Sequence, residues 1–417
     1  DLASLGDRAT VRHIVQSLLE PDAVITEGYQ LHEIETDDGE MSGILIEESG
    51  LSLTLGLATG ETQVIPKSRI KDRRTAPRSA MPSYNTLLGP DQIADLVAYL
   101  TRPKAGSQAG TASTSARISS ADNAVRRDAS SFEVTPEDGR LVITHSGRPV
   151  AEFVYRDAKI LRPYLANVFT PGGLKATRNH PPLPGIDAVD HDTMHPGLWL
   201  GFGDVSGSDF WRNRGHMEHQ RFLEPPRVQD GRLRLATECR LLTEGGKPIG
   251  TITHRLVIAA HPAAWLVSWR AEVKAGADGD LVFGDQEEMG FGARVNTAIT
   301  ERNGGRLLNS AGRVTAASTW GQAAEWCDYA GTVMDRRIGI LLMPDPSNFR
   351  PSWWHNRDYG VFVANPFGQE ALTRGPKSRV TVAPGERLTI GFGAAIHDGE
   401  PADLILPVQE LLRSSKE

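Results

Sequence analysis

The sequence contains only two cysteines, Cys239 and Cys327, and it has no Cys-x-x-Cys-His motif anywhere. Attachment of a c-type haem needs that cysteine pair next to a histidine, so we expect no covalent haem in this chain. The two thiols are able to pair or to stay free, and the sequence leaves both states open.

The chain also lacks a long apolar run and an excess of basic residues. The longest apolar passage, around Leu256 to Val267, is interrupted by His261 and Pro262, so we expect no membrane-spanning helix. The net charge of −7 argues against a general nucleic-acid binder. The sequence begins at Asp1 rather than at methionine, from which we expect a processed N-terminus.

A chain of 417 residues is longer than a domain with a single hydrophobic core usually is, so two or more domains are expected. The 42 glycines and 26 prolines indicate many turns. Residues 104–124 are rich in Ser, Ala, Gly and Thr and show no apolar period. This composition predicts a flexible linker between a small domain at 1–103 and a large domain at 125–417.

The small domain combines helical and strand patterns. Apolar residues at helical spacing predict helices over 11–19 and 91–100, and alternating runs between 29 and 65 predict a small antiparallel sheet. In the large domain, period-two alternation over 233–241 and 265–273 is typical of strands, and 408–414 is the one late helical stretch. We therefore predict a mainly β protein, a large antiparallel β-sandwich preceded by a small α+β domain.

One polar segment, residues 190–219, gathers histidines, aspartates and tryptophans. Imidazoles exchange protons near neutral pH, carboxylates orient them, and indole faces stack on sugars. The alternative is a polar loop with satisfied histidines. From this segment we select three candidate catalytic and three candidate substrate-binding residues: His195, His219 and Asp209, and Trp199, Asp204 and Trp211.

The segment Trp353 to Tyr359 places two indoles, an imidazole, a guanidinium and a carboxylate side by side. A sugar site needs such a mixture of apolar faces and paired donors and acceptors, whereas the alternative is a strand edge with an Arg–Asp pair. We predict that His355 is catalytic and that the substrate binds Trp354, Arg357 and Asp358.

A third segment, Asp285 to Arg294, sets three acids beside glycines and a single arginine. Neighbouring acids can have their pKa values pushed apart, which acid–base catalysis requires, although a solvated acidic turn explains the pattern equally well. We take Glu288 as catalytic and Arg294 as substrate-binding. We expect these three segments to converge on one pocket.

A divalent metal is a further alternative, with His191 and Asp192 as ligands. His191 and His195 are four residues apart, which on a strand is about 13 Å and too far for one ion. Chelation therefore requires a turn, which the sequence Asp190-His191-Asp192 favours.

Several motifs of the large domain occur in a fixed order: His195-Pro196-Gly197-Leu198-Trp199, Gly203-Asp204-Val205, Trp326-Cys327-Asp328-Tyr329, Trp354-His355 and Asn365-Pro366-Phe367-Gly368. Over about residues 125–410 they resemble the bacterial PmoA-like family, labelled methane oxygenase. The resemblance implies a mutarotase-like β-supersandwich, a fold used widely on carbohydrates, and adds Asn365 to the substrate-binding residues.

Residues 1–103 resemble the C-terminal part of a c-type cytochrome module. The resemblance rests on Gly28-Tyr29-Gln30, on Ser79-Ala80-Met81-Pro82 and on the helical ending at 91–100. It implies that Met81 is the axial haem ligand if an upstream half supplies the attachment site.

Together these features predict a periplasmic or secreted carbohydrate-active enzyme, a glycoside hydrolase or lyase. It would cleave or rearrange glycosides, keto-sugar glycosides included, through histidine and carboxylate acid–base chemistry. Two other classes stay open: a non-catalytic sugar-binding domain tethered to a redox module, and an electron-transfer protein that docks a redox partner.

Overall fold

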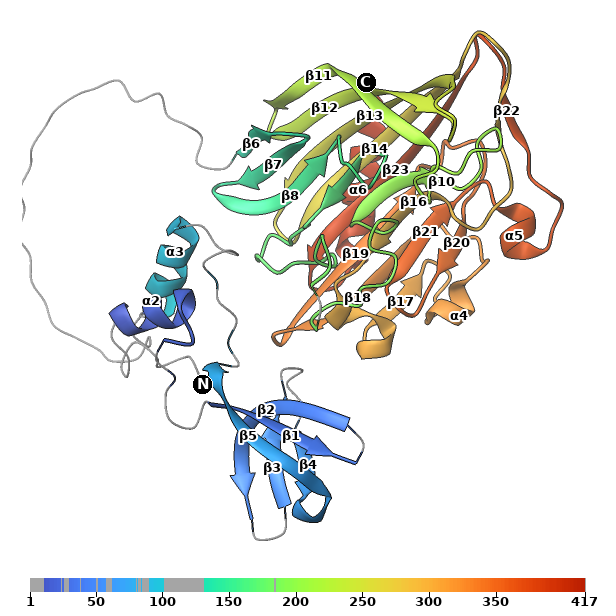
Figure 1. Ribbon diagram of the computed structural model, residues 1–417. Helices are drawn as coiled ribbons and strands as arrows, with labels where there is room; N and C mark the ends of the chain where they lie inside the picture. The colour runs from blue at the N-terminus through green and yellow to red at the C-terminus, as the bar shows by residue number, and fades with distance from the viewer. Residues whose placement is uncertain are drawn as a thin grey trace, which may run out of the picture. The chain divides into compact units, whose positions relative to one another are not determined.

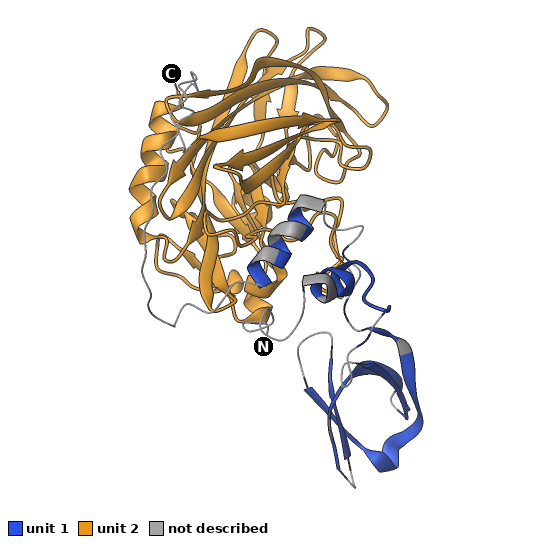
Figure 2. Ribbon diagram, turned by 90° about the vertical axis from the view of Figure 1, so that its left-hand side faces the viewer, with its two compact units in different colours: residues 1–123 blue, residues 124–417 orange. Residues whose placement is uncertain are grey.

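The computed structural model describes residues 11–23, 25, 30–37, 39–49, 52–57, 62–79, 81, 84, 90–100, 131–183 and 185–416. The chain divides into two compact units, residues 1–123 and 124–417 (Figure 2). The predicted linker, 104–124, lies outside the described residues, so its flexibility stays a prediction. Within the described part of the chain, no helix is both long and apolar enough to cross a membrane.

The first unit contains the two predicted helices, which the structure confirms, and a five-stranded antiparallel sheet of order β4-β3-β2-β1-β5. Its elements are α2 (Val11–Leu19), β1 (Gln30–Thr36), β2 (Gly39–Glu48), β3 (Ser52–Gly56), β4 (Thr62–Pro66), η2 (Lys67–Arg69), β5 (Ile70–Ser79) and α3 (Pro90–Leu100). Ile14 and Leu18, one helical turn apart, pack against Ile93 and Val97 of α3.

The second unit is built from two eight-stranded antiparallel sheets (Figure 1). The first sheet has the order β20-β21-β16-β10-β9-β8-β7-β6. Its strands are β6 (Phe132–Glu137), β7 (Arg140–His145), β8 (Arg148–Val154), β9 (Tyr164–Ala166), β10 (Leu198–Phe202), β16 (Met289–Arg294), β20 (Trp353–Asn356) and β21 (Val361–Asn365).

The second sheet has the order β11-β12-β13-β14-β23-β19-β18-β17. Its strands are β11 (His216–Gln229), β12 (Arg232–Leu242), β13 (Pro248–His261), β14 (Ala264–Ala275), β17 (Arg306–Asn309), β18 (Cys327–Val333), β19 (Arg336–Pro344) and β23 (Arg387–Asp398). The remaining short elements are β15 (Leu281–Phe283), β22 (Val380–Val382), η3 (Thr297–Ile299), η4 (Glu301–Asn303), α4 (Ala316–Thr319), α5 (Gln369–Thr373) and η5 (Ala402–Leu404).

The main core lies between the two sheets. Because side chains alternate along a strand, the odd-numbered residues of β14 from Val267 to Val273 all point inward. Among them, Trp269 meets Phe153 and Phe291 of the first sheet at ring-centroid distances of 6.1 and 5.6 Å. The predicted fold class, an antiparallel β-sandwich with a small N-terminal α+β domain, is confirmed.

The outer face of the second sheet is covered by α6 (Ile405–Ser414), the predicted late helix, which lies along the sandwich beside the C-terminus (Figure 2). Val408, Leu411 and Leu412 are buried there. The helix approaches closely because β23 has Gly393 beneath it, where an added Cβ would lie 2.5 Å from Val408 Cγ1. The outer face of the first sheet has no such helix among the described residues and is covered by loops.

Candidate functional site

The candidate site lies on the outer face of the first sheet. His355, Val363, Gly292 and Trp199 are successive cross-strand partners on β20, β21, β16 and β10, so their side chains share one face. The His195 ring stacks on Trp199 at 5.1 Å and therefore lies over the same face. The strands of Trp199 and His355 are three spacings, or about 14 Å, apart.

Glycines in the central strands make room for the two indoles on this face. A Cβ at Gly292 would lie 3.0 Å from Trp199 Cζ2, and a Cβ at Gly201 would lie 3.1 Å from Trp211 Cε3. The two indoles meet edge to face, with ring centroids 5.3 Å apart. Both are fully buried, so they form the floor of the face and expose no ring surface to the substrate that they were predicted to bind.

His195 is packed into this floor. Only 3% of it is exposed, and neither ring nitrogen has a hydrogen-bond partner. Burial, reinforced by the positive charge of Arg294, holds the pKa of His195 well below its ordinary value. The structure therefore places this predicted catalytic histidine as a neutral, packed ring that an external substrate does not reach.

A buried arginine and an exposed loop carboxylate form an ion pair beside His195. Arg294 of β16 is 1% exposed and donates two hydrogen bonds, of 3.0 and 2.8 Å, to Asp190. Partial burial alone would raise the pKa of Asp190, but these bonds and the charge of Arg294 lower it to about 2. Arg294 thus holds the loop that carries Asp190.

Arg178 fixes the same loop through its main chain. Its guanidinium donates to the carbonyl oxygens of Ala188, Asp190, His191 and His195. Sequence reasoning missed this residue, because a lone arginine in a turn-rich segment carries no pattern that reveals its carbonyl partners.

The turn required for a metal site is present, but a full ligand set is not. His195 N–H donates to His191 O, which brings the two rings to 5.1 Å, and His191 Nδ1 lies 3.0 Å from Asp190 Oδ2. Asp192 instead accepts from Thr193 N. Over the described residues no group of three or more His, Cys, Asp or Glu side chains could hold an ion.

At the other end of the face, His355 lies against Glu287. His355 is 3% exposed, and its Nδ1 is 3.6 Å from Glu287 Oε2. Arg357 Nη2 donates to both oxygens of Glu287 at 3.2 Å, and the carboxylate remains 39% exposed. The interaction with His355 lowers the pKa of Glu287, and burial lowers the pKa of His355. At neutral pH the pair is therefore a carboxylate beside a neutral imidazole.

The loop that carries Glu287 is held in place by Asn365 and Asp285. Asn365 is fully buried and donates to the carbonyl oxygens of Gln286 and Glu287, while its own oxygen accepts from Phe367 N. Asp285 caps α5 by accepting from Glu370 N. Asn365, predicted to bind substrate, therefore positions the loop and has no exposed surface.

Tyr359 connects the two ends of the face. Its ring lies 4.7 Å from the Arg294 guanidinium and stacks on His191 at 6.1 Å. Burial raises the pKa of its hydroxyl, which a contact with Arg357 partly offsets. The Asp190–Arg294 pair and the Glu287–His355–Arg357 group thus belong to one continuous polar band.

The other predicted catalytic acids are engaged with Arg212. Glu288 forms a close ion pair with Arg212, which also donates to Asp209 Oδ2 at 2.9 Å. Asp209 in addition accepts from Trp211 N. Arg212 lies close enough to lower the pKa of His355, so this cluster borders the Glu287–His355–Arg357 group. Glu287, one residue before the predicted Glu288, is the carboxylate that faces His355.

Four residues that the sequence predicted for the site lie outside the polar band. Asp204 shapes a turn by accepting from Gly207 N, and Asp358 forms an exposed ion pair with Arg302. Trp354 points into the main core because its neighbour His355 points outward. His219 belongs to the second sheet, where its Nδ1 bonds Thr237 Oγ1 at 2.6 Å.

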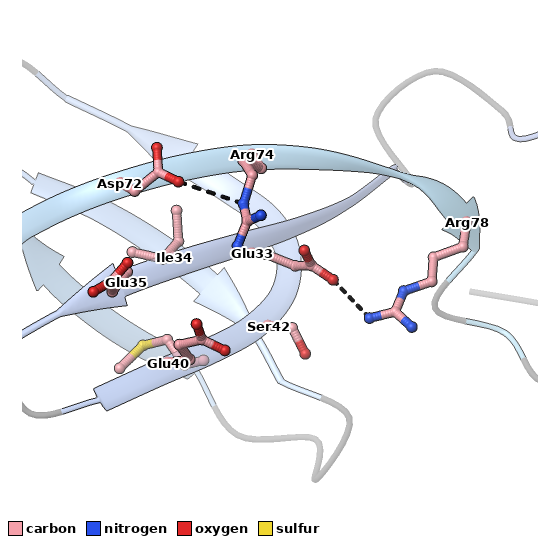
Figure 3. A pocket seen from close by; sticks show the side chains of 9 residues that line it. Glu33, Ile34, Glu35, Glu40, Ser42, Asp72, Arg74 and Arg78 are labelled. Carbon is pink, nitrogen blue, oxygen red and sulfur yellow. Dashed lines mark hydrogen bonds and ion pairs between the residues drawn. The ribbon is translucent and has the colours of Figure 1, made fainter.

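The first unit has a hollow of about 270 Å³ on its small sheet (Figure 3). Figure 3 shows two ion pairs at its edge, Arg74–Asp72 within β5 and Arg78–Glu33 between β5 and β1. Four carboxylates and two guanidinium groups line it: Glu33, Glu35, Glu40, Asp72, Arg74 and Arg78. This hollow lies outside residues 140–404, the part of the chain that matches a protein-family model.

That family model describes a family of unknown function (DUF6807) and matches residues 140–404. A comparison with curated proteins finds no match. Among solved structures, the Slr1438 protein of Synechocystis sp. PCC 6803 is 12% identical, with 68% of this chain and 100% of that chain covered and a TM-score of 0.29. A protein described as a "putative aldose 1-epimerase" from Escherichia coli K12 is 11% identical, with 64% and 98% covered and a TM-score of 0.27.

These findings correct both sequence resemblances. The matching family is not the PmoA-like one, and no comparison supports a cytochrome module over residues 1–103. The quoted motifs are largely packing residues: Trp199, Cys327, Trp354 and Phe367 are fully buried. Met81, whose N–H donates to Ser79 Oγ, loses its implied role as a haem ligand with the module. Both cysteines are buried and unpaired.

The family match spans more than half of the chain and nearly all of the sandwich. The site described above, from Arg178 to Asn365, falls entirely within it. The chain therefore belongs to the family of unknown function DUF6807.

Proposed function

We propose that this protein is a carbohydrate-active enzyme that moves a proton at a sugar ring, with Glu287, His355 and Arg357 as its reaction group. The observation that carries the proposal is the pairing of a buried imidazole with a half-exposed carboxylate that also binds a guanidinium. In this group, His355 exchanges a proton, Glu287 orients the imidazole and supplies negative charge, and Arg357 donates hydrogen bonds to an oxygen of the sugar.

The geometry assigns the proton of His355. If its Nδ1–H points at Glu287, then Nε2 is the nitrogen left to take or give a proton. No described residue hydrogen-bonds to Nε2 of His355, and unlike the two ring nitrogens of His195 it is not sealed from solvent. Burial lowers the pKa of His355, which keeps Nε2 unprotonated at neutral pH and suits it to act as a base. Glu287 stays ionised and fixes the tautomer.

Aromatic faces beside the group provide a platform for a sugar. The Arg357 guanidinium lies 6.0 Å from the ring of Trp320, which is half-buried. Trp353 is also half-buried. It points to the same outer face as His355, because the two residues are two positions apart on β20. Such faces bind the apolar side of a pyranose, while Arg357 can donate to its hydroxyl groups.

The charge state of the group favours rearrangement over glycoside cleavage. A typical glycosidase uses two carboxyl groups, one of which has a raised pKa and protonates the leaving oxygen. Here the pKa of Glu287 is lowered, and Glu288 is tied to Arg212. In anomer interconversion, His355 Nε2 would take the proton of the C1 hydroxyl and give it to the ring oxygen as the bond between C1 and the ring oxygen breaks. The reverse transfers close the ring on the other face of C1, and the ionised Glu287 stabilises the imidazolium in between.

The proposal is tested by following optical rotation after α-anomers of hexoses, pentoses and hexuronates are dissolved with the full chain, alongside chromogenic glycosides. We expect faster anomer interconversion with at least one sugar and no glycoside cleavage, and we expect His355→Asn and Glu287→Gln to abolish the acceleration. An acceleration that both variants retain, or none across the whole panel, would overturn the proposal. Sugar binding without turnover in the wild type would favour a non-catalytic sugar-binding domain.

A further inference from the structure

We propose that a second site, separate from the reaction group, binds an acidic monosaccharide unit. The site is a hollow of about 290 Å³ between the β8–β9 connection and the start of β11. We call it the Arg156 hollow, and it is lined by Tyr155, Arg156, Asp157, Ile160, Leu161, Arg162, His216, Met217, Glu218 and His219. Its volume is at the lower limit of ligand pockets, about 300 Å³, which suits one sugar ring.

Two groups of the hollow, Arg156 and His219, have unused hydrogen-bonding capacity, whereas the buried Arg162 donates to main-chain carbonyl oxygens. Arg156 is exposed and forms no ion pair with any described carboxylate, and its guanidinium lies 5.9 Å from the Tyr155 ring. His219 uses Nδ1 for Thr237, which leaves its Nε2 unbonded among the described residues. The hollow therefore offers a guanidinium and an imidazole nitrogen to a ligand.

The charges of both carboxylates of the hollow are already compensated. Asp157 accepts from Lys159 N, Ile160 N and the Tyr164 hydroxyl. Glu218 accepts from Arg240 and Gln220, both at Oε2, at 2.6 and 2.7 Å, and forms an ion pair with Arg240. Because these carboxylates have partners and the Arg156 guanidinium has no carboxylate partner among the described residues, the hollow favours a ligand that brings its own negatively charged oxygens.

The aromatic wall favours a sugar acid over a small inorganic anion. Tyr155 is half-buried against His219 and Phe222, with ring centroids 4.6 and 5.1 Å away, so its position is fixed. A fixed aromatic surface beside a guanidinium can contact the ring of a hexuronate while the arginine binds the carboxylate. Phosphate alone would use only the second contact.

The hollow and the reaction group share no residue. Arg162 separates the hollow from the floor of the first site, because its buried guanidinium donates to the carbonyl oxygens of Trp211 and Met194. The histidines of the hollow come from β11 of the second sheet, whereas His355 comes from β20 of the first. Occupancy of the two sites can therefore be tested separately.

The test is calorimetric titration of the full chain with sodium D-glucuronate, with D-glucose as the neutral analogue and inorganic phosphate as the bare anion. Arg156→Gln should weaken glucuronate binding by about tenfold or more, because it removes a charge-assisted hydrogen bond. Arg148→Gln is the matched control, since it removes the same charge from an exposed arginine of β8, and it should leave the affinity within about twofold. We expect D-glucose and phosphate to bind at least about tenfold more weakly than glucuronate.

Three results would overturn the proposal. Equal affinities for glucose and glucuronate would remove the role of the charge, and equal affinities for phosphate and glucuronate would remove the role of the sugar ring. Glucuronate binding that Glu287→Gln abolishes and Arg156→Gln leaves intact would place the ligand at the reaction group. Arg156→Gln should leave the rate of anomer interconversion unchanged, so failure of the hollow and failure of the proposed function are distinguishable.

Discussion

The two outer faces of the sandwich are closed in opposite ways. On the second sheet, α6 lays Val408, Leu411 and Leu412 onto the strands, and Gly393 lets it approach closely. On the first sheet, the strands themselves carry a buried arginine, Arg294 of β16, and a buried histidine, His355 of β20, and loops cover them. The apolar contacts under α6 stabilise the fold but contain no groups that could take part in a reaction. The polar band contains titratable groups, and their burial costs desolvation free energy.

The difference supports the proposal that the outer face of the first sheet is the functional one, without reference to any relative. A face that only had to be closed would be covered most simply by an amphipathic helix. The first sheet instead holds its loops through hydrogen bonds from Arg178 and Asn365, each of which binds several main-chain groups. Such a network keeps a reaction group in a fixed geometry.

Replacement of His355 or Glu287 should have the largest effect. General acid–base assistance typically contributes about a hundredfold to ten-thousandfold in rate, so His355→Asn should lower kcat by at least about a hundredfold. The pKa of His355 is lowered, and a base must be unprotonated, so the wild-type rate should fall only as the pH drops below 6.5. Both are measured in the polarimetric assay.

Thermal unfolding provides the control for this variant. His355→Asn should keep a melting temperature close to that of the wild type, because its Nδ1 contact with Glu287 is long. A rate loss that only accompanies a large loss of stability would mean that His355 stabilises the fold and does not take part in the reaction.

Shortening a side chain buried against the outer face of the second sheet should lower the stability of the fold and leave the rate unchanged. Leu412 of α6 is 3% exposed, and Leu412→Ala should lower the free energy of unfolding by about 3 kcal/mol, as buried leucine-to-alanine changes do. The rate of anomer interconversion at 25 °C should stay at the wild-type value. Urea unfolding gives the stability, and a coupled loss of activity would show that the two faces are not independent.

The Asp190–Arg294 pair should make a smaller, pH-dependent contribution. The pKa of Asp190 is lowered from 3.8 to about 2, so its stabilisation is present above pH 3.8 and is lost as the pH falls towards 2. Since Asp190 is 39% exposed, solvent screening reduces that stabilisation to about 1 kcal/mol. Asp190→Asn should therefore be less stable than the wild type at pH 7, and the gap should close by pH 2 in urea unfolding. An equal gap at both pH values would contradict this account.

The smallest effect is expected at Asp358. It forms an ion pair with Arg302, and the side chains are 46% and 62% exposed. Asp358→Ala should change the free energy of unfolding by less than about 0.5 kcal/mol and leave the rate unchanged. A large loss of activity would mean that the site extends to the turn that carries Asp358.

The fold was largely predictable because its signals are periodic. Alternation over 265–273 predicted β14, and helical spacing predicted the helices at 11–19, 91–100 and 408–414. These patterns depend on local spacing, which a single sequence contains. The family resemblances misled because tryptophans of the quoted motifs, such as Trp199 and Trp354, are buried in the packing of the fold.

The site was predictable only in part, because strand parity and loop contacts are not local. Sequence reasoning chose His355, Arg357 and Arg294, which lie on one face, but also Trp354, which points the other way. It chose Glu288 where the structure brings Glu287 to His355. Which of two adjacent acids faces a histidine 68 positions later depends on a loop geometry that only the fold defines.

The proposed role of Glu287 and His355 is tested most directly by a crystal structure of the full chain soaked with mono- and disaccharides. We expect a sugar on the outer face of the first sheet, with an oxygen within about 2.6–3.2 Å of His355 Nε2 and another bound by Arg357. A sugar bound only elsewhere on the sandwich, with Glu287 and His355 untouched, would contradict it.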